Sequence, residues 1–226
     1  MGKLIRPGAE VLFFDDFARG VGNWRREGIG RLQIVDRPGG DGRALRIDCI
    51  GSEQGGAGCH AFCRRDFPDG IALEYDLFVH EKNGLFITFV SMRGLNGQDM
   101  FGLPPRSGVF KDYTGADALV RSYHVSVSRY DDRGKHTGVS NWRRNPGLHL
   151  MGQGPDLCKA IRRTYHITLV KDGRHLQLGV DGKLAHEFTD PDELPDELPA
   201  EGKFGFRAIG SKMIADVSNV RVHRLN

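Results

Sequence analysis

The sequence predicts an all-β protein, a two-sheet antiparallel jelly-roll sandwich in which residues 1–226 form a single domain. Three observations predict it. Apolar and polar residues alternate in roughly a dozen short segments, which is the period of a half-buried strand. Turn signals separate these segments, and the chain contains 31 glycines. Stretches with helical periodicity are scarce. Short strands at close spacing with turns between them are typical of sandwiches and jelly rolls.

The strands expected in the first half follow one another at short intervals. They lie at residues 11–14, 32–35, 44–50, 71–80 and 85–92, with a further strand-like stretch around residues 59–63. The alternation is clearest at 71–80. There Ile71, Leu73 and Tyr75 point one way, and Glu74 and Asp76 point the other way.

The second half contains the strongest hairpin signals. Strands are expected at residues 123–130, 165–171, 175–180, 184–188, 203–207 and 213–223. Asp-Gly pairs at 172–173 and 181–182 predict a three-stranded meander, because such pairs favour two-residue hairpin turns. Two long connections, 93–119 and 131–163, contain aromatic residues, so we expect ordered loops there. The only helix expected is a short one near residues 156–162.

Composition places the chain among ordinary globular proteins. Hydrophobic residues make up 39% and charged residues 27%. No apolar run approaches the roughly 18 residues of a transmembrane helix, and the N-terminus lacks the apolar stretch of a secretory signal. We therefore expect a cytoplasmic protein with no membrane partner. We expect its cysteines to be reduced and buried. They are Cys49, Cys59, Cys63 and Cys158. Their spacing matches no zinc pattern, and no metal or other cofactor is expected.

Charge is distributed unevenly along the chain. The net charge is +3, yet residues 190–201 contain six acids and no bases. The rest of the molecule therefore prefers anions. A solvated surface and an anionic ligand both remain open, with uronate sugars ahead of nucleic acid, because no basic stripe interleaved with aromatic residues is present. No nucleic-acid partner is expected. The acidic segment is either a solvated turn region or a calcium site built from carboxylates.

Several blocks of the sequence resemble known families. The opening Asp15-Asp16-Phe17 with residues 23–28, and the terminal strand 214–222, resemble concanavalin A-like lectin/glucanase sandwiches. Four ordered blocks resemble the bacterial YesU-like family, which is of unknown function and whose prototype comes from a rhamnogalacturonan-utilisation locus. These blocks are Tyr123-His124-Val125-Ser126, residues 141–154, Tyr165-His166-Ile167-Thr168 through Lys171, and Gly205-Phe206-Arg207. The resemblance implies a galectin- or glucanase-like jelly roll in the cytoplasm, linked to plant-polysaccharide breakdown. It implies the fold more strongly than the reaction.

Glu74 and Asp76 are the first candidate catalytic residues. Two residues apart on one strand, their carboxylates leave the same face about 7 Å apart. Glycosidases use paired carboxylates, one as acid and one as base or nucleophile. Laminarinase-type glucanases carry Glu-x-Asp-x-x-Glu on such a strand, but Phe78 and Val79 stand where the third carboxylate is required. An ordinary polar strand face is the competing interpretation.

Histidine and tyrosine residues suggest a second chemistry. A polysaccharide lyase needs a base to take the proton beside a uronate carboxylate, and planar donors to neutralise that carboxylate. The candidates for the base are His60, His124 and Tyr123, and His149 is a further candidate at the ligand. The candidate donors are Arg129, Arg143, Asn145, Gln153 and Arg207. We expect His60, Glu74 and His124 to line one concave sheet. Each histidine alone is equally compatible with a structural role.

Trp142-Arg143-Arg144-Asn145 is the best candidate segment for ligand binding. Sugars stack their C–H faces on aromatic rings and offer hydroxyls to planar donors, and this segment contains both kinds of group. The competing interpretation is a tryptophan that anchors the loop, with its arginines in solvent. Phe110, Tyr113 and Tyr123 would extend an aromatic wall, and Phe62 would share the face of His60.

The leading hypothesis is a cytoplasmic carbohydrate-active protein. It would act on oligosaccharides from plant cell-wall polysaccharide that contain acidic sugar, cleaving a glycosidic bond by hydrolysis or β-elimination. The alternative is a non-catalytic, lectin-like sugar-binding module. An interaction protein that kept only the sandwich is a third hypothesis. The expected partner is an oligosaccharide. The sugar, the linkage and whether the protein forms a homo-oligomer are left open.

Overall fold

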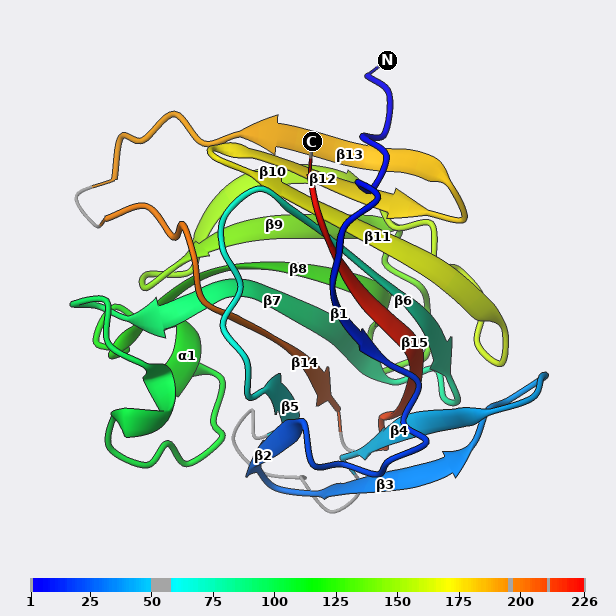
Figure 1. Cartoon of the computed structure of the whole chain (residues 1–226). Helices are drawn as coiled ribbons and strands as arrows, with labels where there is room; N and C mark the ends of the chain where they lie inside the picture. Colours follow the sequence, from blue (N-terminus) through cyan, green and yellow to red (C-terminus); the bar gives the residue numbers. More distant parts are fainter. Residues whose placement is uncertain (1, 50–57, 195–196, 211, 226) are drawn as a thin grey trace.

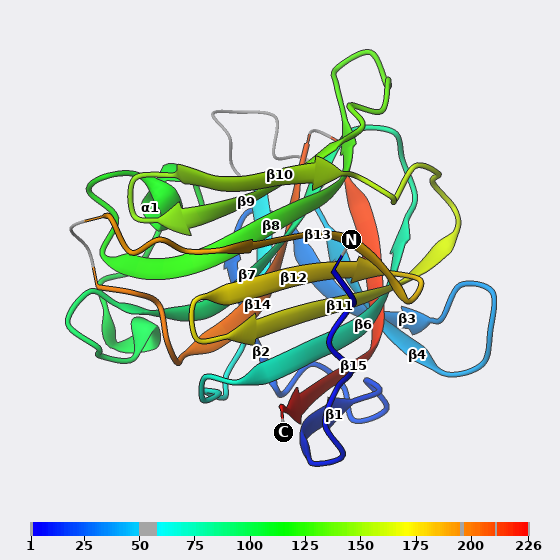
Figure 2. The same ribbon diagram turned by 90° about the horizontal axis from the view of Figure 1, so that it is seen from above.

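Two antiparallel β-sheets face each other in the computed structural model of the chain (Figure 1). The structure describes residues 2–49, 58–194, 197–210 and 212–225. Within these residues one sheet has eight strands and the other seven. Figure 2 shows β8 (Val120–Tyr130), β9 (Val139–Asn145) and β10 (His149–Pro155) along one side of the molecule. Along the other side it shows β6 (Ile71–Val79), β11 (Thr164–Asp172) and β12 (His175–Val180). The predicted all-β, two-sheet sandwich is confirmed.

The eight-stranded sheet contains the meander that the Asp-Gly turns predict. Its order is β13-β12-β11-β6-β15-β4-β3, and β1 pairs with β15. The strands in this order are β13 (Lys183–Thr189), β12 (His175–Val180), β11 (Thr164–Asp172), β6 (Ile71–Val79), β15 (Ile214–Arg224), β4 (Arg43–Asp48) and β3 (Arg31–Asp36), with β1 at Val11–Asp15. The last residue of the strand expected at 44–50 lies outside the described residues.

The seven-stranded sheet joins strands from all parts of the chain. Its order is β10-β9-β8-β7-β14-β5-β2. These strands are β10 (His149–Pro155), β9 (Val139–Asn145), β8 (Val120–Tyr130), β7 (Gly84–Gly94), β14 (Lys203–Ile209), β5 (Gly58–Cys63) and β2 (Trp24–Gly28). Neighbouring strands such as β5 and β14 are far apart in the sequence, so long-range pairing builds this sheet.

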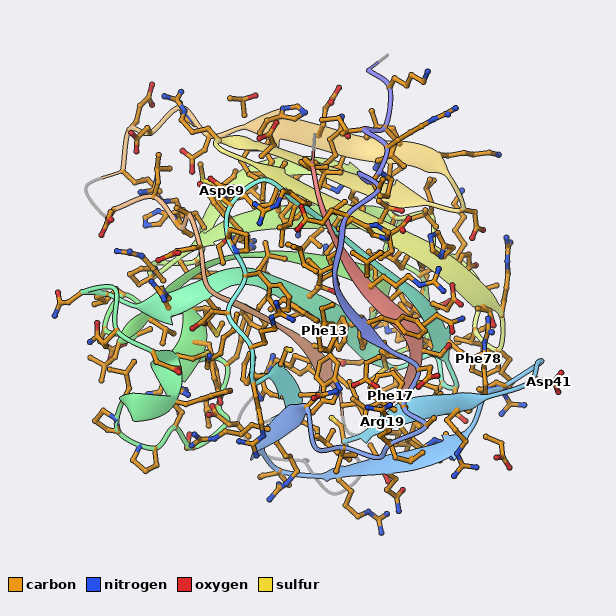
Figure 3. All side chains as sticks on the ribbon, in the orientation of Figure 1. Phe13, Phe17, Arg19, Asp41, Asp69 and Phe78 are labelled. Carbon is orange, nitrogen blue, oxygen red and sulfur yellow. The ribbon has the colours of Figure 1, made fainter. Side chains whose placement is uncertain are left out.

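The hydrophobic core fills the space between the sheets (Figure 3). The side chains expected to face inward on β6 do so, and β5 contributes Cys59, Ala61 and Cys63 from the other sheet. All four cysteines are free and buried, as expected. Phe17, labelled in Figure 3, packs against Trp24 in this core with 5.8 Å between ring centroids. Alternation therefore leaves His60 and Glu74 on the outer faces of their sheets.

The connection 131–163 is not the loop that the sequence suggested. It contains β9 and β10, which pair as a hairpin. The inner face of β9 has Ser140 and Arg144 on either side of Trp142, where a simple alternation requires apolar residues, so the strand signal is weak. The helix expected at 156–162 is also absent, and this described stretch is irregular. Asp156 is fully buried there and accepts hydrogen bonds from the backbone N–H groups of Arg129 and Cys158, which hold the chain in a turn.

The connection between β7 and β8 folds over the outer face of the seven-stranded sheet. It contains a short 3-10 turn, η1 (Met100–Gly102), and one turn of helix, α1 (Lys111–Thr114). Met100 and Tyr113 from this connection pack against Phe62, Ile87 and Phe89 on the sheet in a second apolar cluster. Residues 95–119 are called the cover below.

The acidic segment 190–201 is partly buried. Asp190 is fully buried. It accepts a hydrogen bond from Tyr123 Oη at 2.5 Å and forms an ion pair with Arg144 at 3.2 Å. Glu197 pairs with Arg121, and Glu201 with Arg93. The expectation of a fully solvated turn region is therefore wrong for these residues. Residues 195–196 of the segment lie outside the described residues.

Candidate functional site

The predicted catalytic residues lie on two opposite faces of the molecule. Glu74 and Asp76 are on β6 and face outward from the eight-stranded sheet. His60 on β5 and His124 on β8 face outward from the seven-stranded sheet. The expectation that all of them line one sheet is therefore wrong. Strand alternation assigns a residue to a face of its own sheet, but it does not say which sheet a strand joins.

Beneath the cover, polar side chains of the seven-stranded sheet form a compact group. We call it the covered cluster, and its members are His60, Phe62, His124, Asn145 and Arg207. Every member is at most 2% exposed. The register explains the grouping, because Arg207 pairs with His60 across β14 and β5, and Arg143 pairs with His124 across β9 and β8. Four of the five members have polar side chains. Burying a polar side chain is costly unless it has a hydrogen-bond partner.

His124 lies at the centre of hydrogen-bonding groups from two strands. Its Nδ1 is 2.9 Å from Asn145 Nδ2, which also donates to Ser122 Oγ at 3.0 Å. In this orientation Nδ1 accepts and Nε2 carries the proton, and the buried Asn145 Oδ1 has no partner. With the amide turned, Oδ1 accepts from Nδ1–H and Nε2 presents a lone pair. The orientation of the Asn145 amide therefore decides whether the His124 ring acts as a hydrogen-bond donor or as a base.

Electrostatics keep the imidazole of His124 neutral. Burial, with the nearby positive charges of Arg143 and Arg207, lowers the pKa of His124 to about 3. His60 behaves in the same way, since burial and then the charge of Arg207 lower the pKa of its ring well below the usual value. Burial also lowers the pKa of Arg207 to about 10, which leaves the guanidinium charged at neutral pH. The cluster therefore combines positive charge with neutral imidazoles.

Aromatic rings enclose these polar groups. The ring of Tyr113 from the cover is 4.2 Å from that of His60, and Phe62 is 5.4 Å from it on the same strand. Phe110 lies under the guanidinium of Arg207 at 4.5 Å and edge-on to His124 at 5.6 Å. Rings and a guanidinium in contact are suited to the C–H faces and polar groups of a sugar.

A buried carboxylate ties the cover to the sheet. Glu27 on β2 accepts hydrogen bonds from Arg106 Nε at 2.9 Å, from Arg106 Nη2 at 2.7 Å and from Tyr113 Oη at 2.8 Å. Burial, and then the charge of Glu27, raise the pKa of Tyr113. The phenol is therefore protonated at neutral pH and donates to the carboxylate.

Polar side chains continue along the outer face beyond the covered cluster. Asn141 and Arg143 alternate with the inward Trp142 on β9, and Ser126 lies opposite Asn141 on β8. The side-chain amides of Gln153 on β10 and of Asn141 lie 2.9 Å apart. Arg143 is partly exposed and donates to the backbone carbonyl oxygen of Leu148 at 2.6 Å. The sheet face beside His124 therefore presents planar hydrogen-bond donors.

The second group of ionisable residues lies on the eight-stranded sheet. His166 on β11 bridges the two predicted carboxylates, with Nε2 3.2 Å from Glu74 Oε1 and Nδ1 2.9 Å from Asp76 Oδ1. Hydrogen bonds to these carboxylates raise the pKa of His166 to about 9. A hollow of about 310 Å³ beside Glu74 and His166 is lined by residues 3–7 of the N-terminal segment.

This ion network argues against glycosidase chemistry at Glu74 and Asp76. The hydrogen bond from His166 lowers the pKa of Glu74. Burial alone would raise the pKa of Asp76, but hydrogen bonds from His166 and Asn219 outweigh it and lower that pKa. A glycosidase acid needs the opposite, a carboxyl group whose pKa is raised. The arrangement is typical of a structural ion pair on a strand face.

The remaining predicted residues are distributed between the core and the sheet face. Tyr123 and Trp142 face the core between the sheets, so neither belongs to the covered cluster. Trp142 packs against Phe188 at 5.9 Å and cannot stack on a ligand from solvent. Arg129 donates to the backbone carbonyl oxygen of Val139 at 3.0 Å. His149 is partly exposed at the start of β10.

Several residues of the two groups were not found from the sequence. Arg106 and Ser122 had no motif to mark them, and Glu27 lay in the block 23–28 that indicated only the fold. Their partners come from strands or loops distant in the chain. His166 does alternate with core residues on β11, which is a usable signal for an outward side chain. In the described part of the chain, no group of three or more His, Cys, Asp or Glu residues is arranged to hold a metal ion. No helix described here is long and apolar enough to cross a membrane.

The fold and the covered cluster together define a galectin-like β-sandwich with buried cationic and aromatic residues on the outer face of one sheet. The chain belongs to the family described as a domain of unknown function, DUF1961, whose model matches residues 11–222. It is 27% identical over 212 residues to the uncharacterized protein YesU of Bacillus subtilis, covering 90% of each protein. The chain is also similar to a crystal structure of a Bacillus subtilis protein of unknown function with a galectin-like fold. That likeness has 25% identity, 98% coverage of both chains and a TM-score of 0.84.

More distant structures share the sandwich. The carbohydrate-binding module CBM66 from Bacillus subtilis has a TM-score of 0.54 at 14% identity, with 89% of this chain and 95% of the module covered. The β-glucanase of Bacillus licheniformis has a TM-score of 0.58 at 12% identity, with 96% of this chain and 100% of the enzyme covered. At these identities the likeness establishes the fold alone, and the fold is shared by binders and enzymes.

Proposed function

We propose that this protein is carbohydrate-active and takes short oligosaccharides that contain an acidic sugar. One observation carries the proposal: Arg143 and Arg207 flank the neutral imidazole of His124, with Phe110 in contact with both His124 and Arg207. Guanidinium groups match a carboxylate in shape and charge, and aromatic rings match the apolar face of a sugar ring. The sandwich fold, shared with a carbohydrate-binding module and a β-glucanase, supports this class.

Of the two cleavage reactions, the residues favour β-elimination over hydrolysis. With Asn145 turned, His124 Nε2 takes the proton from the carbon beside the uronate carboxylate, and Arg143 and Arg207 stabilise the developing enolate. The electron pair of that C–H bond forms a C=C bond while the glycosidic C–O bond breaks. The departing oxygen takes the proton from the imidazolium, which returns His124 to its neutral form. No carboxylate is required as nucleophile, so Glu74 and Asp76 stay outside the reaction.

The biological setting follows from the same chemistry. The YesU-like resemblance and the cationic cluster support fragments of rhamnogalacturonan, in which galacturonate alternates with rhamnose, as the substrate. The four free, buried cysteines are compatible with the reducing cytoplasm, which is where we place the protein. Cell fractionation with an antibody to the protein would test that location directly.

Mass spectrometry of oligosaccharide digests tests the reaction. A panel of rhamnose–galacturonate fragments is incubated with the protein and with its His124→Ala and Glu74→Ala variants. Elimination yields products whose masses sum to that of the substrate, whereas hydrolysis adds one water. We expect elimination products, lost in His124→Ala and retained in Glu74→Ala. Loss of activity only in Glu74→Ala would overturn the assignment of the site.

A non-catalytic sugar-binding module is the second candidate. It is favoured by the amide orientation in which Asn145 Nδ2 donates to His124 Nδ1, because His124 then offers only a donor to the ligand. If no fragment is cleaved while a known lyase works in the same buffer, the enzymatic proposal fails. Titration calorimetry with the same fragments and an Arg143→Met variant then tests binding. Equal affinity for the two proteins would exclude Arg143 as part of the sugar site.

A further inference from the structure

The covered cluster cannot receive a ligand in the conformation described. His60, His124, Asn145 and Arg207 are each at most 2% exposed, and Tyr113 and Phe110 of the cover lie against them. A sugar ring is several ångströms thick, so the proposed function requires part of the cover to move. The contacts of the cover identify which part that is.

The cover has its own contacts with the rest of the chain on each side of residues 104–113. At one end, Arg25 Nη1 donates to the Phe101 carbonyl oxygen at 3.4 Å, and the ammonium of Lys203 lies 4.9 Å from the Phe101 ring. At the other end, the backbone N–H of Gly147 donates to the Thr114 carbonyl oxygen at 2.9 Å. Residues 104–113 lie between these anchors. Their polar ties to the sheet, from Arg106 and Tyr113, both end on Glu27.

The tip of this stretch meets the sheet through two glycines. Gly108 has φ +92° and Gly28 on β2 has φ +84°, conformations that favour glycine. A Cβ added to Gly108 would lie 2.1 Å from the Cα of Gly28, so the backbones touch where no side chain fits. At the tip this contact joins backbone to backbone, and the apolar packing of the stretch on the sheet comes from Phe110 and Tyr113. Local opening therefore has to break the Glu27 latch and the packing of these two rings.

We propose that residues 104–113 form a flap that swings off the covered cluster to admit the acidic sugar, and that Glu27 is its latch. The inference rests on the proposed function for the identity of the ligand, but the motion is a property of the chain itself. The hinges are at the anchored ends, near Pro104 and Thr114. On closing, the flap returns Phe110 and Tyr113 to the ligand, so it both admits the sugar and completes its aromatic wall.

Chemical modification of histidines measures the opening directly. Diethyl pyrocarbonate acylates neutral imidazoles that solvent reaches, and His60 and His124 are neutral but buried. Their modification rates, followed by peptide mass spectrometry, therefore report the open population of the flap. Partly exposed His149, outside the flap, serves as the internal reference in every sample.

Two variants release the flap by different means. Glu27→Gln keeps the shape of the latch but removes its charge, and charge-assisted hydrogen bonds of this kind make at least a tenfold difference in opening when lost. Gly108→Ala lifts the tip off Gly28 and leaves the latch residues intact. We expect modification of His60 and His124 to accelerate about tenfold or more in both variants, with His149 unchanged. The matched control is Glu10→Gln, which removes an exposed ion pair to Arg224 on the other sheet and should change neither rate.

The outcomes separate the flap from the proposed function. If both variants fold, as judged by circular dichroism, and the two histidines react as slowly as in the wild type, the flap does not exist. If Glu27→Gln fails to fold, Gly108→Ala alone decides. A galacturonate-containing trisaccharide is then added to the wild type. Protection of His124 from modification supports an acidic sugar as the ligand. If modification accelerates in the variants but no acidic sugar protects His124, the flap is confirmed and the proposed function is overturned.

Discussion

The protonation state of His124 is the property through which an acidic ligand should act. Burial first, and then the charges of Arg143 and Arg207, hold the pKa of its ring at about 3. A base with so low a pKa is a poor proton acceptor at neutral pH. A carboxylate placed between the two guanidinium groups would offset their charge and favour the imidazolium. We therefore predict that binding an acidic oligosaccharide raises the pKa of His124.

The size of this change follows from Coulomb's law. A carboxylate about 4 Å from the ring, at an effective dielectric constant near 20, interacts with the imidazolium by about 4 kcal/mol. That interaction corresponds to an upward displacement of the titration midpoint by roughly 3 pH units. The same carboxylate pairs with the arginines, which reduces the field at the ring, so we expect a displacement of roughly 1 to 3 pH units. The ring then titrates closer to neutral pH, where it is useful as a base and as an acid.

Heteronuclear NMR of the imidazole ring tests this prediction. The chemical shifts of His124 are followed from acid to neutral pH, with and without saturating galacturonate oligosaccharide. A neutral oligosaccharide of the same length is the matched ligand control, and His149 is the reference histidine. Saturation by the acidic ligand with an unchanged midpoint for His124 would refute the placement of the carboxylate. An equal displacement by the neutral sugar would show that the cause is a change of burial and not charge.

Two further predictions concern stability. The pKa of His166 is raised to about 9 in the folded protein, so its contribution is fully present below about pH 6.5 and is lost as the pH rises through about 9. Because this side chain is 45% exposed, we expect His166→Gln to cost only about 1 kcal/mol at pH 6 and much less at pH 10, measured by urea denaturation. A cost independent of pH would contradict the ion network. Arg144→Met leaves the buried Asp190 without its ion-pair partner and should cost about 3–5 kcal/mol, seen as a thermal midpoint lower by roughly 6–20 °C; a loss below about 1 kcal/mol would contradict it.

The fold was predictable because its signals are local. The strand at 71–80 alternates without interruption, and the Asp-Gly pairs encode the turns of the β11–β12–β13 meander directly. β9 was not predicted, and the reason is a charged residue that faces the core. Its inner face has Arg144, whose charge is satisfied by Asp190 from a segment far along the chain. Alternation of apolar and polar residues does not reveal a strand whose inner face combines Trp142 with a buried ion pair.

The site was less predictable because it depends on which sheet each strand joins. Alternation correctly turned His60 and His124 outward, and likewise Glu74, but only the register places the two histidines on one sheet and the carboxylate on the other. For Trp142, the interpretation failed because of the direction in which its side chain points. Its position beside Arg143 and Asn145 suggested a sugar platform, yet neighbours along a strand face opposite ways, and the ring is part of the core. Two aromatic residues that do touch the cluster, Phe110 and Tyr113, come from the cover.

The separation of the two ionisable groups bears on the choice between enzyme and binder. A hydrolase on this sandwich would need its paired carboxylates and its ligand platform on one face. Here the pair is neutralised by His166 on the eight-stranded sheet, while the cationic and aromatic residues are on the seven-stranded sheet. A lectin needs no neutral imidazole enclosed beneath a cover, because hydroxyl recognition works at an open surface. A histidine beside two guanidinium groups and shielded from water matches the requirements of proton abstraction beside a carboxylate, which is why elimination is the reaction to test first.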